Sequence, residues 1–167
     1  MHDGAMIGPP SGMEWTHLLT AGEFIDASGP IYMTRDGLDA DEPIRFGMRI
    51  GRHHCNGLDV CHGGMLATFL DTAMANGLLE TGGIARNLPT INMALDYLAP
   101  AQLGDWVESR VAVLRRTRKL GFVQAILRTD RGIVIRGNAV FRIRPLVVEG
   151  PSSIVMEPPS ARSPAPP

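Results

Sequence analysis

The sequence predicts an α+β fold in which a curved antiparallel β-sheet wraps around one long central helix, at about residues 63–80. Two observations predict it. Between residues 44 and 143, most segments alternate apolar and polar residues, which is the pattern of a half-buried strand. One segment among them instead repeats its apolar residues at helical spacing. The predicted order is therefore strand, helix and four strands in one domain.

The strands are predicted at residues 44–50, 91–97, 105–116, 120–129 and 133–143. In the first of them, Phe46 and Met48 alternate with Arg45 and Arg49. The last three strands are joined by connections of only a few residues, at 117–119 and 130–132. Connections this short join antiparallel neighbours, so these three strands form a meander.

The helix is predicted from an apolar stripe at positions i, i+3, i+4, i+7 and i+8. Its members are Leu66, Phe69, Leu70, Ala73, Met74, Gly77 and Leu78. Gly63 and Gly64 open the segment, and a second glycine pair, at 82–83, closes it as expected for a helix end. Most of the other positions are apolar too, so the helix is expected to be buried nearly all round.

The two ends of the chain are predicted to lie outside the domain, which spans residues 30–145. Residues 1–29 form an N-terminal segment that is expected to be partly flexible, with a short helix around 14–21. Residues 146–167 form a proline-rich tail for which disorder is expected, because seven of the thirteen prolines occur from Pro145 onward. The first residues lack the basic and apolar regions of a secretion signal, so a cytoplasmic location is expected.

Composition excludes several classes of protein. The 167 residues carry a formal net charge of −1, which argues against a nucleic-acid-binding protein, and no apolar run approaches the ~18 residues of a membrane helix. The charge is unevenly spread, since residues 1–104 hold five Arg and twelve acidic residues, whereas residues 105–144 hold ten basic and three acidic residues. Cys55 and Cys61 are expected to be reduced thiols. We expect neither nucleic acid nor a membrane as a partner.

Asp71 is the first candidate catalytic residue. It is the only acidic residue of the predicted helix before Glu80, and at 100° per residue it lies beside Met74 and Leu78, at the margin of the apolar stripe. Two interpretations are open at this point. The side chain is either a solvated carboxylate on an exposed edge, or a partly desolvated one whose raised pKa makes it a better general base.

The residues that lead into the helix also allow two interpretations. Gly63 and Gly64 serve a turn, or they leave backbone N–H groups open to a ligand at the positive end of the helix dipole, which suits an oxyanion. Asn56, followed by glycine, is typical of a tight turn. His62 taken alone is typical of a capping or packing residue.

Metal and thiol chemistry are weaker candidates for the same loop. His53, His54, Cys55, Cys61 and His62 are of the types that bind zinc, but their spacing is not that of a zinc site and no second ligand cluster follows. No partner set for a nucleophilic Cys61 can be named, although a helix N-terminus would lower its pKa. No metal and no cofactor are therefore expected.

Taken together, these residues form an ordered set: Asn56, then His62-Gly63-Gly64, then Asp71, then the run from Thr90 to Pro100 with Tyr97 inside it, and Leu103-Gly104-Asp105. This set resembles the hotdog-fold thioesterases of the PaaI-like, phenylacetate-pathway type, over roughly residues 44–143. The resemblance implies a hotdog fold and an acyl-CoA thioesterase that hydrolyses a small-molecule acyl-CoA, aryl or short- to medium-chain, to the free acid and CoA.

The resemblance also implies a role for each residue of the set. In this family the N–H of the glycine at the helix start, here Gly63, polarises the thioester carbonyl, and the helix aspartate, here Asp71, acts as base or nucleophile. Asn56 helps to hold the carbonyl or the water, Thr90 helps to position water, and His62 has a supporting role beside the thioester.

Substrate contacts are expected from two further groups of residues. Gly64 and Met65 follow the glycine that binds the carbonyl. Arg115, Arg116 and Arg118 lie around one predicted hairpin and are candidates to meet the phosphates of CoA. The alternative for these arginines is that charged side chains protect an edge strand from aggregation.

Helix geometry predicts that the protein is a homodimer. Gly63 and Asp71 are eight residues apart, or ~12 Å along a helix axis, so one chain does not easily place both around one thioester carbon. Two antiparallel helices across a two-fold axis bring Asp71 of one chain near Gly63 of the other, which gives two equivalent sites at the interface. The resemblance implies the same assembly, and a dimer of dimers is expected from it.

Two other functions are compatible with the same scaffold. The first is a non-catalytic hotdog protein that binds acyl-CoA and has a regulatory role, although the complete set of Asn56, Gly63, Asp71 and Thr90 argues against it. The second is a hydratase or dehydratase, which would need a His–Asp or His–Glu arrangement, whereas His62 is placed to support the carbonyl, so this function ranks lowest. The sequence does not specify the acyl group.

Overall fold

The computed structural model describes residues 8–18, 22–38, 42–85 and 88–144. Within these ranges, seven antiparallel strands form one sheet in the order β1-β2-β3-β5-β6-β7-β4. The strands are β1 (Thr16–His17), β2 (Ile31–Thr34), β3 (Arg45–Arg49), β4 (Thr90–Tyr97), β5 (Trp106–Arg116), β6 (Leu120–Thr129) and β7 (Gly132–Arg142). The helices are α1 (Glu23–Ser28), α2 (Gly63–Leu79) and a 3₁₀ turn at Arg52–His54.

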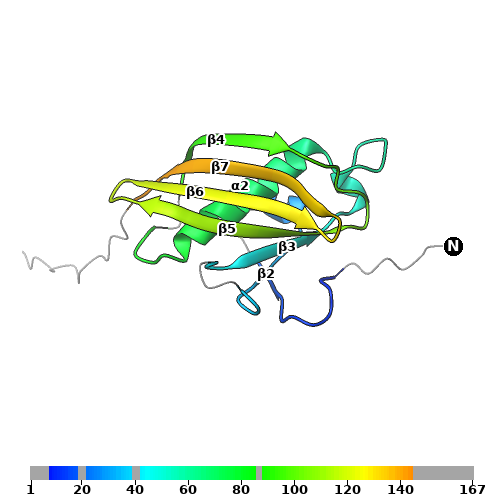
Figure 1. The fold of residues 1–167 in the computed structure, drawn as a ribbon, viewed down its shortest axis with the longest axis horizontal. Helices are drawn as coiled ribbons and strands as arrows, with labels where there is room; N and C mark the ends of the chain where they lie inside the picture. Colours follow the sequence, from blue (N-terminus) through cyan, green and yellow to red (C-terminus); the bar gives the residue numbers. More distant parts are fainter. Residues whose placement is uncertain (1–7, 19–21, 39–41, 86–87, 145–167) are drawn as a thin grey trace, which may run out of the picture.

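Helix α2 packs along the inner face of the sheet, behind β5, β6 and β7 (Figure 1). The predicted strands and the meander are confirmed, and all seven residues of the predicted apolar stripe are buried. The opposite side of the helix is more open than predicted, since Met65, Ala67, Ala75 and Leu79 are only half-buried in the single chain. That side includes Asp71.

Two glycines allow α2 to approach the sheet closely. A Cβ atom added to Gly77, in the helix, would lie 2.6 Å from the Val111 side chain on β5. One added to Gly121, on β6, would lie 2.3 Å from Leu78 of the helix. Real Cβ atoms do not come this close to their neighbours, so the depth of the helix in the sheet depends on these two positions.

The N-terminal segment differs from the prediction. The helix expected around residues 14–21 is wrong over residues 14–18, where β1 pairs with β2, and residues 19–21 lie outside the described ranges. A short helix occurs later, at Glu23–Ser28. Trp15 explains the difference, because its ring meets Trp106 of β5 edge to face at a centroid distance of 5.1 Å. This tertiary contact outweighs the local helical spacing.

Three β-bulges break the predicted alternation, and the one on β5 makes Leu114 the extra residue between Val113 and Arg115. On β7, Leu127 of the neighbouring strand pairs with Ile135 and Arg128 pairs with Ile133, so that Val134 is the extra residue and is buried while Ile133 is 43% exposed. On β4, the register shifts between Thr90 and Asn92. Because a bulge inserts one extra residue, the side chains beyond it point to the opposite face from the one they would have in a regular strand.

The proline-rich tail predicted at residues 146–167 lies outside the part of the chain that the structure describes. Within the described part, none of the helices has both the length and the apolar character needed to span a membrane.

We expect the substitution Gly77→Ala to destabilise the fold. Alanine is the better helix former, but its methyl group would overlap Val111, and overpacking of this kind costs about 1–3 kcal/mol. Urea unfolding followed by circular dichroism measures the difference. Gly57→Ala is the matched control, because no atom lies within 4 Å of the Cβ position there. Equal stability of the two variants would contradict the prediction.

Candidate active site

The N-terminus of α2 presents one free backbone donor. His62 caps the helix, and its Nδ1 accepts the N–H of Gly64 at 3.0 Å. The N–H of Gly63 has no hydrogen-bond partner within the described ranges. An unpaired N–H at the positive end of a helix dipole is suited to bind a carbonyl oxygen that gains negative charge.

Tyr97, at the end of β4, lies against this helix terminus. Its hydroxyl donates to the carbonyl oxygen of Gly63 at 3.0 Å. A Cβ atom at position 63 would lie 3.2 Å from the Tyr97 ring, so the tyrosine leaves little room for any residue larger than glycine. The sequence alone predicts no role for Tyr97. Its place in the run from Thr90 to Pro100 was the only available signal, because the contact with Gly63 depends on tertiary packing.

Asp71 and Thr90 form the second part of the site. The Thr90 hydroxyl donates to Oδ1 of Asp71 at 2.9 Å. Partial burial raises the pKa of Asp71 above its ordinary value, and the hydrogen bond from Thr90 opposes that rise. The structure therefore favours the desolvated carboxylate over the fully solvated one. A carboxylate in this state is a better base near neutral pH.

The β-bulge in β4 brings Thr90 to Asp71. Regular alternation would put Thr90 on the face opposite to Met93 and Leu95, which pack against the core beneath α2. The extra residue, Ile91, reverses that alternation and is itself 57% exposed. Thr90 and Tyr97 consequently both reach α2 from the two ends of one strand.

Asn56 belongs to a tight loop before the helix. Its side-chain Oδ1 accepts the N–H groups of Leu58, at 2.9 Å, and Val60, at 3.3 Å, which is the turn geometry that Asn favours. The side chain is exposed, and its NH₂ group makes no hydrogen bond to a described residue. The turn thus uses the side-chain oxygen of Asn56 as an acceptor, and the side-chain nitrogen remains available to a ligand.

The other polar residues of this loop have structural roles. His54 is buried, with Nδ1 accepting the Gly51 N–H at 2.9 Å and Nε2 lying 3.0 Å from the Ser28 carbonyl. Cys55 and Cys61 are free thiols, and burial raises the pKa of Cys61 to about 12, which disfavours a nucleophilic thiolate. Among the described side chains, no cluster of three or more His, Cys, Asp or Glu could hold a metal ion.

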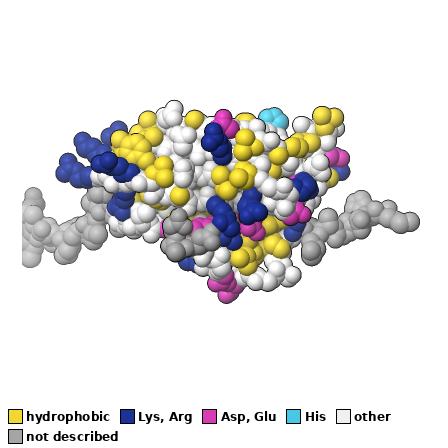
Figure 2. All heavy atoms as spheres, in the orientation of Figure 1, with side chains coloured by type: hydrophobic (Ala, Val, Ile, Leu, Met, Phe, Trp, Pro, Cys, Tyr) yellow, Lys and Arg dark blue, Asp and Glu magenta, His cyan; other side chains and the backbone are white. Residues whose placement is uncertain are grey.

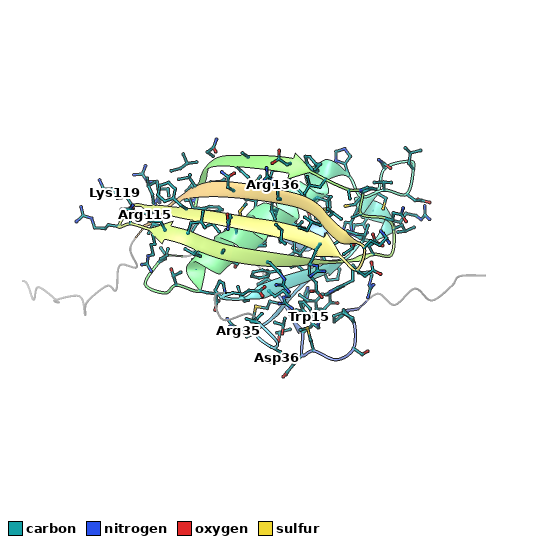
Figure 3. The ribbon with its side chains drawn as sticks, viewed as in Figure 1. Trp15, Arg35, Asp36, Arg115, Lys119 and Arg136 are labelled. Carbon is teal, nitrogen blue, oxygen red and sulfur yellow. The ribbon has the colours of Figure 1, made fainter. Side chains whose placement is uncertain are left out.

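The arginines predicted to meet CoA lie at the far end of α2 from Gly63. Arg116 donates to the carbonyls of Thr81 and Gly82, at 3.1 and 2.7 Å, and so caps the C-terminal end of the helix. Arg115 and Arg118 are exposed near the turn between β5 and β6, where Figure 3 shows Arg115 beside Lys119. Lys and Arg side chains gather at this end of the molecule (Figure 2).

A hollow of about 540 Å³ lies away from these residues. It is lined by Gln124, Arg136 and Asn138 among others, on the face of the sheet opposite to α2. None of the candidate catalytic residues lines it. We therefore base the site on the hydrogen-bonded residues along α2 and β4, with Met65 half-buried beside Gly64 on the same side of the helix.

Comparison with known proteins identifies relatives of this chain. Residues 58–135 match the family model described as the thioesterase superfamily. A Pseudomonas aeruginosa protein named as an esterase is 25% identical over 138 residues, which are 83% of this chain and 99% of that protein. Human acyl-coenzyme A thioesterase 13 is 30% identical over 80 residues, which are 48% of this chain and 56% of that protein.

A solved structure supports the fold. The PaaI protein of the phenylacetic acid degradation operon of E. coli aligns with a TM-score of 0.62 and 20% identity, over 73% of this chain and 85% of that one. At this level of sequence identity, the similarity supports a shared fold and nothing further. The predicted hotdog fold is confirmed, with its antiparallel sheet and one long helix.

We expect Thr90→Val to raise the pKa of Asp71 further. The substitution removes the one hydrogen bond that lowers this pKa and leaves burial, which raises it. The pKa can be measured from the pH titration of the carboxyl ¹³C resonance of Asp71. Thr90→Ser keeps a hydroxyl and should stay near the wild-type pKa. A lower pKa in Thr90→Val would show that the hydroxyl does not stabilise the carboxylate.

Proposed function

We propose that the chain is a thioester hydrolase of the thioesterase superfamily, whose family model matches residues 58–135, and that it hydrolyses a small-molecule acyl-CoA, aryl or short- to medium-chain, with Asp71 and Gly63 as its catalytic groups. The observation that carries the proposal is the half-buried Asp71, hydrogen-bonded to Thr90, on the same helix as the free N–H of Gly63. The relatives named as an esterase and as an acyl-coenzyme A thioesterase support this substrate class.

In the proposed reaction, the thioester carbonyl oxygen accepts the N–H of Gly63, which stabilises the negative charge that develops there. Asp71 takes a proton from water as the water oxygen bonds to the carbonyl carbon, or its own oxygen attacks that carbon. The carbon–sulfur bond then breaks and CoA leaves as a thiolate. Thr90 holds the carboxylate, and the Asn56 amide nitrogen is available to hold the carbonyl or the water.

We propose that a second copy of the chain completes the site, paired along β4. Strand β4 is at an edge of the sheet, with β7 on one side only, yet Ile91, Tyr97 and Leu98 are 57%, 54% and 56% exposed. A long edge strand with exposed apolar residues is a template for pairing with another chain. The half-exposed side of α2 adjoins the same edge.

The placement of the four site residues supports a two-fold axis at the middle of β4. Asp71 is bonded to Thr90 at one end of this strand, and Gly63 is bonded to Tyr97 at the other end. Antiparallel pairing of two β4 strands sets the Thr90 end of one chain beside the Tyr97 end of its partner. Each Asp71 would then face the partner's Gly63, and a further pairing of two such dimers would give the expected dimer of dimers.

We expect Asp71→Asn to fold and to lose at least ~100-fold in kcat, the scale of a lost acid–base group. Hydrolysis of a panel of aryl- and alkyl-CoA esters, followed by detection of free thiol, measures the rate. Glu80→Gln removes a carboxylate from the end of the same helix, where it pairs with Arg35, and should keep wild-type rates. Binding of acyl-CoA by the wild type without thiol release would favour the non-catalytic, regulatory alternative.

A shared site also predicts complementation between two inactive variants. Gly63→Pro removes the N–H at the first position of the helix, where the backbone tolerates proline, and Asp71→Asn removes the carboxylate. Because the proline ring would lie close to Tyr97, circular dichroism first checks that Gly63→Pro folds. If each site uses Asp71 of one chain and Gly63 of the other, a mixed dimer has one intact site. Refolding the two variants together at equal amounts should restore about a quarter of wild-type activity. No activity above that of either variant alone would place both groups in one chain.

A further inference from the structure

We infer that Tyr97 is a positioning residue that fixes which nitrogen of His62 carries the proton, acting through the peptide group between Gly63 and Gly64. The inference deepens the proposed function and rests on it, because His62 adjoins the N–H that would bind the thioester carbonyl. It concerns a group that the reaction scheme above does not use, the Tyr97 hydroxyl.

Three groups form a continuous chain of hydrogen bonds at the start of α2. The Tyr97 hydroxyl donates to the Gly63 carbonyl at 3.0 Å. That carbonyl and the N–H of Gly64 belong to one peptide group, and this N–H donates to Nδ1 of His62 at 3.0 Å. A donor on the carbonyl polarises the amide and strengthens its N–H as a donor, so the two bonds support each other.

This chain selects one neutral form of the imidazole. Because Nδ1 accepts the Gly64 N–H, it carries no proton, and the proton of a neutral ring is then on Nε2. The His62 side chain is exposed, and no described residue accepts a hydrogen bond from Nε2. The Nε2–H is therefore left for a ligand. Together with the N–H of Gly63, the helix start has two donors that no described residue uses.

The aromatic ring and the hydroxyl of Tyr97 have separable effects. The ring lies beside Gly63, where it limits the space above the helix terminus. The hydroxyl alone makes the bond to the Gly63 carbonyl. Tyr97→Phe keeps the ring and removes only the bond, so any change in His62 in this variant reports on the hydrogen-bonded chain. Tyr32→Phe, on β2, removes a hydroxyl far from the site and is the matched control.

The first arm of the test is ¹⁵N NMR of the histidine ring in the protein without substrate, with the His62 signals identified by their loss in His62→Gln. The wild type and Tyr32→Phe should show an unprotonated Nδ1 and a protonated Nε2. Tyr97→Phe should shift both signals toward an average of the two neutral forms. A wild type with the proton on Nδ1, or a Tyr97→Phe variant with unchanged His62 signals, would overturn the inference.

The second arm is steady-state hydrolysis of acyl-CoA. Loss of one hydrogen bond that holds a transition-state donor should lower kcat of Tyr97→Phe by about fivefold to tenfold and leave KM unchanged. An unchanged kcat, or a lower kcat with unshifted His62 signals, would refute the positioning role of Tyr97. The proposed thioesterase activity would not be affected by that result. Conversely, if the wild type hydrolyses no acyl-CoA but His62 is in the Nε2–H form and shifts in Tyr97→Phe, the proposed function is refuted and the positioning role of Tyr97 is supported.

Discussion

The close contact between α2 and the sheet is the constraint on which the rest of the structure depends. The stripe from Leu66 to Leu78 is buried, and Gly77 and Gly121 remove the side chains that would hold the two surfaces apart. Because the helix is set deep in the sheet, its N-terminus and Asp71 both come within reach of β4. A helix displaced outward by one methyl group would lengthen the contacts from Thr90 and Tyr97, each of which spans 3.0 Å or less.

Strand β4 contacts both candidate groups of α2, the carboxylate of Asp71 and the helix start at Gly63. It is one strand, yet it supplies a hydroxyl to the carboxylate of Asp71 at one end and a hydroxyl to the helix terminus at the other. The bulge at Ile91 makes this possible, since a regular strand of this length would direct Thr90 and Tyr97 to opposite faces. The same strand has no neighbour on its outer side among the described residues, so the site lies at an open edge of the sheet.

Periodicity was sufficient to predict the central part of this architecture and insufficient for its details. The five strands and the helix follow from alternation and from the apolar stripe, because burial on one face leaves a regular pattern in the sequence. The bulges at Ile91 and Val134 leave no such pattern, and the contact between Trp15 and Trp106 that decides the N-terminal segment joins residues far apart in sequence. The sequence offers Asp71, Gly63 and Thr90 as candidates, and the structure joins Asp71 to Thr90 by a hydrogen bond, but the contact of the Tyr97 hydroxyl with Gly63 depends on where β4 meets α2.

The partly buried environment of Asp71 has a cost to stability. Its pKa is raised in the folded protein, so the folded state holds this proton more tightly than the unfolded state does. Stability is therefore lost as pH rises from the ordinary value of 3.8 through the raised pKa of the folded state. Thr90 offsets part of this loss by hydrogen-bonding the charged form. Desolvation at the edge of an apolar helix face thus disfavours the charged carboxylate and at the same time makes it a stronger base.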